Sequence, residues 1–570
     1  ARPACALAML LVLTLGAAPA HASPNLIVNG SQTFQRIAGV GVTVNVNSWN
    51  GGALRPALDL LAQPAAAGGA GMTTFRVVRD PMTWVANESD IALLQTLDPP
   101  TLGRIYEAPA MRDLWATIAY LDSIGVPGDH IVLNFMGWTP TWLGGSGAYG
   151  APSKLTAGKE SELAVMIASL VYYGRVVRGL DIELLSPVNE PDWNCLEGPC
   201  IGPSQYVVFL RALITQLDAM GLSDVRLVGP DTASQSNADG YIAAMMGDAT
   251  IAGRVDHFAL HNYGAATSPR TAYAGHDYWL TETAASCGSC DTGGTPAQGE
   301  WAFATETADI LLGSLGAGMS LVAYYDGYDS FYYHHNQYGY WGLLAYDTTT
   351  TTYTPRKRFY VVAQTSGFVA PGSRRLAVTR TLSGLGVTQA FFDSSTGRVA
   401  IVGRNTSSTA ITIQGELDHL PAPDTLTCTV TGPGTTNLTP AAPIAVTGGS
   451  FTVTIPALTV FSLAGSNPPA VAVPPSSGVA ITWVSAARPN PTSGGAQLTL
   501  TLPAPGEVGF RVLDVQGRAL WRSPVRRYDA GRWTLSWDGR TAVGPAPVGV
   551  YFARIRAGDR VFTRAIVIVR

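Results

Sequence analysis

The stretch DIELLSPVNEP, residues 181–191, joins a short apolar run to Asn189, Glu190 and a proline. A second stretch, DYWLTE at residues 277–282, likewise joins apolar residues to a glutamate, Glu282. Short apolar runs bounded by turn residues are typical of buried strands, so each glutamate stands where a strand gives way to a loop. These two stretches predict strands whose ends carry carboxylates.

Similar runs alternate with segments of helical spacing between about residues 34 and 347. The strand candidates are 37–44, 73–78, 130–135, 181–188, 225–228, 255–261, 277–281 and 320–325. The helical segments are 54–61, 111–124, 160–173, 204–220, 238–246 and 301–315. Eight strands alternating with helices predict an α/β fold, a (β/α)8 TIM barrel over residues 23–347. A doubly wound open sheet is the alternative, but no glycine-rich phosphate-binding sequence follows the first strand.

The carboxyl ends of barrel strands converge on one mouth, where active sites are built. Glu190 and Glu282 end the fourth and seventh strands, which face each other across that mouth. Taken singly, each glutamate would be a solvated loop residue. Taken together, they predict a catalytic pair, with a spacing of ~5–5.5 Å in retaining glycosidases and ~6.5–9.5 Å in inverting ones.

The Asn-Glu-Pro after strand four and the Thr-Glu after strand seven resemble clan A of the glycoside hydrolases, whose members are retaining (β/α)8 enzymes. Within the clan, the sequences at 35–41 and 357–372 are similar to family 30. The resemblance covers roughly residues 25–465. It implies that 25–34 pairs with a side β-sandwich at 348–465, and that the substrate is a β-linked polysaccharide such as xylan, β-1,6-galactan or β-glucan.

The same resemblance assigns roles to single residues. Glu190 would be the acid/base, Glu282 the nucleophile, and Asn189 would bind the sugar 2-hydroxyl. Arg76 on strand two would hold Glu282 ionised, although Arg79 competes for that role. The remaining site residues end strand six: Tyr263 would donate to Glu282, and His261 would contact sugar hydroxyls.

Aromatic side chains indicate the class of ligand, because sugar rings offer apolar C–H faces to flat platforms. The candidate platforms are Trp138, Trp142, Trp193, Tyr325 and Trp341. Packing against the side sandwich is the alternative for about half of the aromatic residues in this region. The clan commonly has a tryptophan on strand eight, where this sequence has tyrosines.

The cysteines occur in two close pairs, Cys195 with Cys200 and Cys287 with Cys290. They predict two disulfides, paired within or between the motifs, or else one four-thiolate zinc site. An oxidising compartment favours disulfides. Cys428 lies in an alternating strand pattern that predicts a buried free thiol. No catalytic metal or cofactor is expected, because a carboxylate mechanism needs none.

The first 22 residues hold Arg2, an apolar run and the sequence Ala20-His21-Ala22, which together predict a cleaved signal peptide and a secreted or cell-surface protein. A membrane anchor is the alternative, but the run is short for one. Charged residues are only 13% of the chain, the net charge is −4, and the basic residues form no dense run. Nucleic acid and membrane insertion are therefore not expected.

The sequence after the barrel is poor in helical patterns. It predicts the side β-sandwich at 348–465, a Pro-rich linker at 466–478, and an Ig-like β module at 479–570. The last module resembles those of flagellar hook-capping proteins and type IX secretion sorting domains, which implies a role in secretion or surface attachment. Carbohydrate binding is its alternative role. For the whole chain, the alternative to an enzyme is a non-catalytic glycan-binding or adhesive protein.

Overall fold

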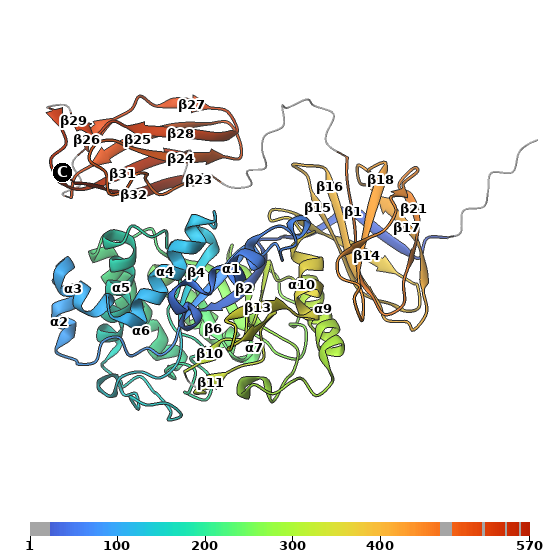
Figure 1. Cartoon of the computed structure of the whole chain (residues 1–570), viewed down its shortest axis with the longest axis horizontal. Coiled ribbons are helices and arrows are strands. Elements are labelled where there is room, and N and C mark those ends of the chain that lie inside the picture. Colours follow the sequence, from blue (N-terminus) through green and yellow to red (C-terminus); the bar gives the residue numbers. More distant parts are fainter. Residues whose placement is uncertain are drawn as a thin grey trace, which may run out of the picture.

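The computed structural model describes residues 23–333, 335–467, 482–515, 519–541, 544–557 and 560–569. The predicted signal peptide and all but the first two residues of the predicted linker lie outside these residues. The chain forms a barrel, a β-sandwich and a C-terminal β module (Figure 1). Among the described helices, none combines the length and the apolar character that a membrane span requires.

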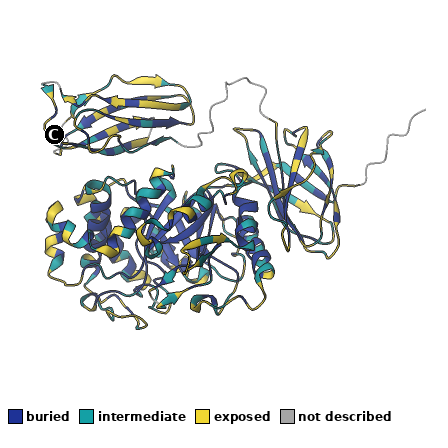
Figure 2. Ribbon diagram, in the orientation of Figure 1, coloured by how far each residue is buried: buried dark blue, intermediate teal, exposed yellow. Residues whose placement is uncertain are grey.

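Eight parallel strands close into the predicted barrel, and the open-sheet alternative is excluded. They are β2 (Gly39–Asn45), β3 (Thr74–Arg79), β4 (Ile131–Phe135), β5 (Leu184–Ser186), β6 (Arg226–Thr232), β7 (Val255–His261), β8 (Asp277–Thr283) and β9 (Leu321–Tyr324). The strands are almost wholly buried (Figure 2). Small and branched side chains such as Val132, Val228 and Ala259 fill the interior beneath the mouth, as in a packed barrel core.

The helices pack around the strands with their apolar faces inward. Six match the predicted segments: α1 (Arg55–Ala62), α4 (Pro109–Ser123), α5 (Glu160–Tyr172), α6 (Pro203–Ala219), α7 (Gln235–Met246) and α9 (Glu300–Gly316). Three shorter ones were not predicted: α2 (Asp90–Leu94), α3 (Pro99–Tyr106) and α8 (Ala249–Ala252). The large hydrophobic core lies between this layer and the barrel strands.

Helix α10 (Lys357–Ser366) lies in the region that was predicted to be poor in helices. It packs against α9, and its Phe359 and Val362 belong to the core of the barrel. Its buried residues include Arg358, Gln364 and Thr365, so polar side chains occupy buried positions where the pattern of a surface helix has apolar ones. Two short hairpins precede it: β10 (Phe331–Tyr332) with β11 (Gln337–Tyr338), and β12 (Leu344–Asp347) with β13 (Thr352–Pro355).

The side sandwich is built from ten strands around its own apolar core. The N-terminal strand β1 (Leu26–Arg36) pairs antiparallel with β14 and parallel with β17. The other strands are β14 (Arg374–Arg380), β15 (Leu385–Asp393), β16 (Arg398–Asn405), β17 (Ile411–Asp418), β18 (Thr425–Thr431), β19 (Thr439–Pro440), β20 (Ile444–Ala445), β21 (Ser450–Ile455) and β22 (Val460–Ser466).

The C-terminal module has two main sheets and a separate core that includes Trp537. One sheet contains β23 (Trp483–Val484), β24 (Ala496–Leu502) and β28 (Gly531–Trp537). The other contains β25 (Gly506–Leu513), β26 (Ala519–Arg522), β27 (Arg526–Tyr528), β31 (Gly549–Ala557) and β32 (Arg560–Ile568). The short strands β29 (Arg540–Thr541) and β30 (Gly544–Pro545) form a hairpin.

Two arginines of β32 connect this module to the barrel. Nη2 of Arg564 lies 2.9 Å from Oδ2 of Asp181, and both side chains are buried. Arg560 lies 3.3 Å from Asp129 at the surface. Asp129 and Asp181 precede β4 and β5, so the module contacts the end of the barrel opposite the mouth, and lies beside α4 and β4 in Figure 1.

Candidate active site

Glu190 and Glu282 meet at the barrel mouth. Glu282 lies in β8, and Glu190 follows β5 in a turn where its φ of 42° is left-handed. The turn is held by a hydrogen bond from the backbone N–H of Glu190 to the carbonyl of Asp231. The two side chains are 4% and 3% exposed, and an oxygen of one lies within 4.8 Å of an oxygen of the other. The barrel thus brings the two carboxyl groups to nearly direct contact.

Both oxygens of Glu282 accept hydrogen bonds from protein donors. Nη1 of Arg76 donates to Oε2 at 2.6 Å, and the hydroxyl of Tyr263 donates to Oε1 at 2.5 Å. Burial and the adjacent Glu282 charge raise the pKa of Tyr263 well above its usual value, so the phenol keeps its proton. Arg79, the competing candidate, instead contacts Asn47 and the carbonyl of Asp80.

His261 occupies a different place from the predicted one. It is fully buried, with Nδ1 2.7 Å from Oε1 of Glu190 and Nε2 3.1 Å from Oδ1 of Asp231. Both ring nitrogens therefore face carboxylates, and neither is presented to a sugar. The contact of His261 with sugar hydroxyls stays a prediction; in this structure the imidazole lies between the candidate acid Glu190 and the deeper carboxylate of Asp231.

Asp231, at the end of β6, is the site residue that the sequence did not reveal. Its Oδ2 accepts hydrogen bonds from Arg76 at 2.9 Å, Asn134 at 3.0 Å and Ser186 at 2.9 Å, and its Oδ1 accepts from Thr281. The predicted strand stopped at Val228, because a Gly-Pro pair is ordinarily a turn signal. Here the strand continues through the pair, and Asp231 adopts a φ of 62° at its end.

The charges in this cluster stabilise one another. Burial alone would lower the pKa of His261, but the negative charges of Glu282 and Asp231 outweigh it and raise the pKa to about 10. Burial would raise the pKa of Asp231, yet Arg76 and His261 hold it far below its usual range. Arg76 and His261 are therefore cationic and Asp231 is anionic at neutral pH.

The pKa of Glu190 is raised. Burial is the main cause, and the nearby Glu282 charge adds to it, while the hydrogen bond and positive charge of His261 oppose both. The two candidate catalytic glutamates thus have unlike surroundings. Two strong donors bind Glu282, whereas Glu190 has one charged donor and a desolvated environment that favours its neutral form.

Asn189 is also fully buried, and most of its amide is used within the protein. Its Oδ1 accepts a 2.5 Å hydrogen bond from Nη2 of Arg76, and its Nδ2 donates to the carbonyl of Glu197 at 3.1 Å. The second N–H of Nδ2 is therefore the amide group that remains for the predicted contact with a sugar 2-hydroxyl. Asn189 also fixes the guanidinium that binds Glu282.

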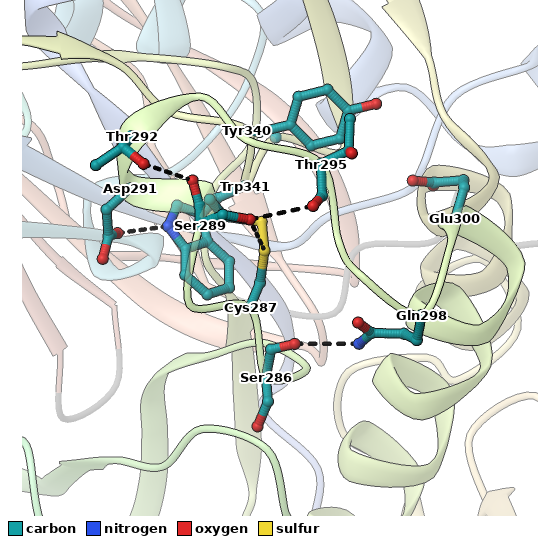
Figure 3. The surroundings of a disulfide bond; sticks show 12 residues. Ser286, Cys287, Ser289, Asp291, Thr292, Thr295, Gln298, Glu300, Tyr340 and Trp341 are labelled. Atoms are coloured by element: carbon teal, nitrogen blue, oxygen red, sulfur yellow. Dashed lines mark hydrogen bonds between the residues drawn. A yellow bond between two sulfur atoms is a disulfide. The ribbon is translucent and has the colours of Figure 1, made fainter.

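Tyr325 and Trp341 pack edge-on against Tyr263, with ring centroids 6.4 and 5.6 Å from it. Both are buried, so they support the phenol that binds Glu282 and do not form an open platform. Nε1 of Trp341 donates to Asp291 at 2.6 Å, beside the Cys287–Cys290 disulfide (Figure 3).

The other three predicted platforms lie in the loops that follow β4 and β5. Trp142 packs against the barrel core and donates to the carbonyl of Val85 at 3.1 Å. Trp138 lies 6.3 Å from Tyr149, edge to face. Trp193 is 53% exposed in the loop that follows Glu190, and its indole is the most accessible of the five.

The cysteines form disulfides within each motif, Cys195–Cys200 and Cys287–Cys290, which excludes the four-thiolate zinc site. Cys428 is a buried free thiol in β18. Each disulfide closes a loop that follows one of the glutamates. Both loops are also tied by backbone hydrogen bonds, from Ser153 to the carbonyl of Cys195 and from Tyr340 to that of Cys290.

Glu190, His261 and Glu282 are close enough together to be considered as metal ligands. The raised pKa of His261, about 10, means that its ring is protonated at neutral pH. A protonated imidazole has no lone pair to offer, so this trio is poorly suited to a cation.

No protein-family model matches the sequence, and no curated protein matches it. Solved structures are similar in fold. The family 30 subfamily 8 xylanase Xyn30A of Clostridium acetobutylicum has a TM-score of 0.57 at 20% identity, covering 78% of this chain and 100% of its own. Xylanase C of Talaromyces cellulolyticus has a TM-score of 0.57 at 16% identity, covering 78% and 100%.

The endo-β1,6-glucanase BT3312 has a TM-score of 0.58 at 16% identity, covering 78% of this chain and 94% of its own. The structural neighbours are thus family 30 glycoside hydrolases and related glycosidases, in which an eight-stranded barrel is joined to a β-sandwich. At these identities the similarity defines the fold of the chain.

Proposed function

We propose that the protein is a retaining glycoside hydrolase, with Glu282 as the nucleophile and Glu190 as the acid/base. The observation that carries the proposal is that an oxygen of Glu190 lies within 4.8 Å of an oxygen of Glu282. Retaining enzymes need the two groups ~5–5.5 Å apart, whereas inverting enzymes leave ~6.5–9.5 Å for a water molecule. The close pair therefore favours direct attack on the sugar.

Glu282 is suited to be the nucleophile because it is held as an oriented carboxylate. Arg76 and Tyr263 each donate to one of its oxygens. In the first step, a Glu282 oxygen forms a bond to the anomeric carbon as the glycosidic C–O bond breaks, which gives a covalent glycosyl-enzyme. Tyr263 and Arg76 keep the carboxylate in line for this attack.

Glu190 is suited to be the acid because charge balance favours its neutral form. Arg76 and His261 bring two positive charges into the buried cluster, and Asp231 and Glu282 bring two negative ones. A protonated Glu190 leaves the cluster neutral, and its raised pKa agrees with this. Glu190 gives its proton to the leaving glycosidic oxygen and later takes one from the water that releases the sugar.

The proposed substrate is a β-linked polysaccharide of the xylan, β-1,6-galactan or β-glucan type. The fold similarity to xylanases and to an endo-β1,6-glucanase supports this class. The two disulfides support action outside the cytoplasm. Attachment or secretion through the C-terminal module is part of the same proposal.

The test is the release of reducing ends from xylan, galactan, glucan and mannan by the wild type, Glu282→Ala and Glu416→Ala. Glu416 lies on β17 of the sandwich and serves as the matched control. Turnover on one glycan that falls by orders of magnitude only in Glu282→Ala, with retained anomeric configuration in early NMR spectra, is expected. Binding without turnover in all three proteins would instead support the non-catalytic alternative.

A further inference from the structure

The positive charge of the chain is concentrated in its C-terminal module. Residues 479–570 contain 13 arginines and no lysine against 5 carboxylates, whereas the whole chain has 36 basic and 40 acidic residues. The module is therefore strongly basic and the rest of the chain is acidic. Such an asymmetry raises the local concentration of polyanions around one end of the molecule.

The outer face of the sheet that contains β25, β26 and β31 holds a groove of about 770 Å³. Its lining residues include Glu507, Arg511, Arg522, Val525, Arg554 and Arg556. The four arginines are exposed, and they are distinct from Arg560 and Arg564, which contact the barrel. The groove is therefore a separate surface from the contact with the barrel.

Three of these arginines form a row across neighbouring strands. In the antiparallel register, Arg511 is directly opposite Arg522 on one side and Arg554 on the other. In the part of the chain that the structure describes, none of the three forms an ion pair with a carboxylate. Like charges directly opposite each other destabilise a sheet, so the arginine row lowers the stability of the module. A bound anion would reduce this repulsion.

We propose that this groove binds an acidic polysaccharide, a glycan chain that carries carboxylate or sulfate groups. Guanidinium groups form paired hydrogen bonds with both anions, and an all-arginine surface favours such geometry over lysine point charges. Adjacent strands are ~4.8 Å apart, a step similar to the length of one pyranose ring, so the row can follow charges along a sugar chain.

Other polyanions fit this groove less well. A concave surface receives a chain more readily than a flat membrane. Single-stranded nucleic acid is usually held by aromatic side chains on which its bases stack. The aromatic residue that lines the groove, Phe510, packs against Trp521 with ring centroids 5.0 Å apart, and it is buried in the module core. The proposal does not depend on the activity of the barrel.

The test measures binding of the full-length protein to polygalacturonate, to heparin and to neutral xylan by isothermal calorimetry in about 0.1 M salt. Two variants of equal charge change are compared: Arg511→Gln/Arg554→Gln in the groove, and Arg532→Gln/Arg540→Gln on exposed positions outside it. The groove variant is expected to lose at least tenfold in affinity for the acidic glycan, and the control less than threefold.

The groove variant is also expected to unfold at an unchanged or higher temperature, because it removes like-charge contacts. The polygalacturonate and heparin arms distinguish carboxylate from sulfate, and binding of either supports the proposal. No binding of either glycan by the wild type overturns it, as do equal losses in the two variants. Tighter binding to phosphatidylglycerol vesicles or to single-stranded DNA than to both glycans overturns the choice of ligand.

Discussion

Nδ1 of His261 lies 2.7 Å from Oε1 of Glu190, and no other charged donor contacts that carboxyl group in the described residues. The imidazole is in turn held by Asp231, 3.1 Å from its Nε2. The proton affinity of the proposed acid therefore depends on a cation that is itself fully buried. Glu190, His261 and Asp231 therefore form one electrostatic unit in the proposed active site.

Replacing His261 by Asn is expected to shift the alkaline limb of the kcat/KM profile to higher pH. The Asn amide keeps a donor near the position of Nδ1 but removes the charge. Because the positive His261 lowers the pKa of Glu190, its loss raises that pKa, and Glu190 stays protonated to higher pH. An unmoved or lowered alkaline limb would mean that His261 is neutral in the working enzyme.

Replacing Asp231 by Asn is expected to cost about 3–5 kcal/mol of unfolding free energy at pH 7, because Arg76 and His261 lose a buried counter-charge. The folded-state pKa of Asp231 is lowered, so its contribution is complete above the ~3.9 of an unfolded Asp and is lost as pH falls further. The difference between wild type and variant in the free energy of urea unfolding should therefore shrink as pH falls below 4.

The control for this prediction is Ser186→Ala, which removes one neutral donor to the same carboxylate and should cost about 1 kcal/mol. If the two variants are equally stable, the charge of Asp231 does not stabilise the fold. If Asp231→Asn folds normally but kcat falls at least tenfold, the carboxylate acts mainly by positioning Arg76 and His261.

The strand–helix alternation was sufficient to predict the barrel, and the two glutamates could be found because they end matching strands. Arg76 and Tyr263 were assigned from the resemblance to clan A, and the structure places both beside Glu282. Asp231 was missed because Gly229-Pro230 interrupts the sequence pattern of β6 but not the strand itself.

The sequence could not predict which of the candidate site residues are buried. Histidine and asparagine commonly bind sugars, but the side chains of His261 and Asn189 already contact neighbouring side chains of the protein. Tyr325 and Trp341 look like platforms in the sequence, yet both are enclosed around Tyr263. Whether an aromatic ring faces a cleft or the core depends on side-chain packing, which residue spacing does not encode.

Removing the Cys287–Cys290 disulfide with the double variant Cys287→Ser/Cys290→Ser is expected to cost about 2 kcal/mol, the loop entropy of a four-residue ring. The loop carries Asp291, which binds Trp341, which in turn packs on Tyr263. We therefore expect a several-fold loss in kcat as well as a lower melting temperature. The matched Cys195→Ser/Cys200→Ser variant should affect KM more, because its loop follows exposed Trp193. Unchanged kinetics and melting in both variants would contradict a role for the disulfides at the mouth.

Replacing Arg564 by Ala is expected to release the C-terminal module from the barrel. The variant leaves buried Asp181 without its cation, next to other acidic groups of the barrel end. Burial and Asp181 already raise the pKa of Asp122 to about 6, and burial, Asp181 and Asp129 raise that of Glu183 to about 7. With the guanidinium removed, repulsion among these carboxylates opposes docking most strongly above pH 7, where they are ionised.

The release should be visible as a larger radius of gyration in small-angle X-ray scattering. Arg560→Ala is the matched control, because its ion pair with Asp129 is exposed and such pairs contribute ~1 kcal/mol or less. Both variants should keep wild-type turnover of short substrates, since the contact lies at the end of the barrel away from Glu190 and Glu282. Identical scattering of Arg564→Ala and wild type at pH 8 would show that the module is held by other contacts. A return of the Arg564→Ala radius of gyration to the wild-type value at pH 5.5 would identify carboxylate repulsion as the cause of release.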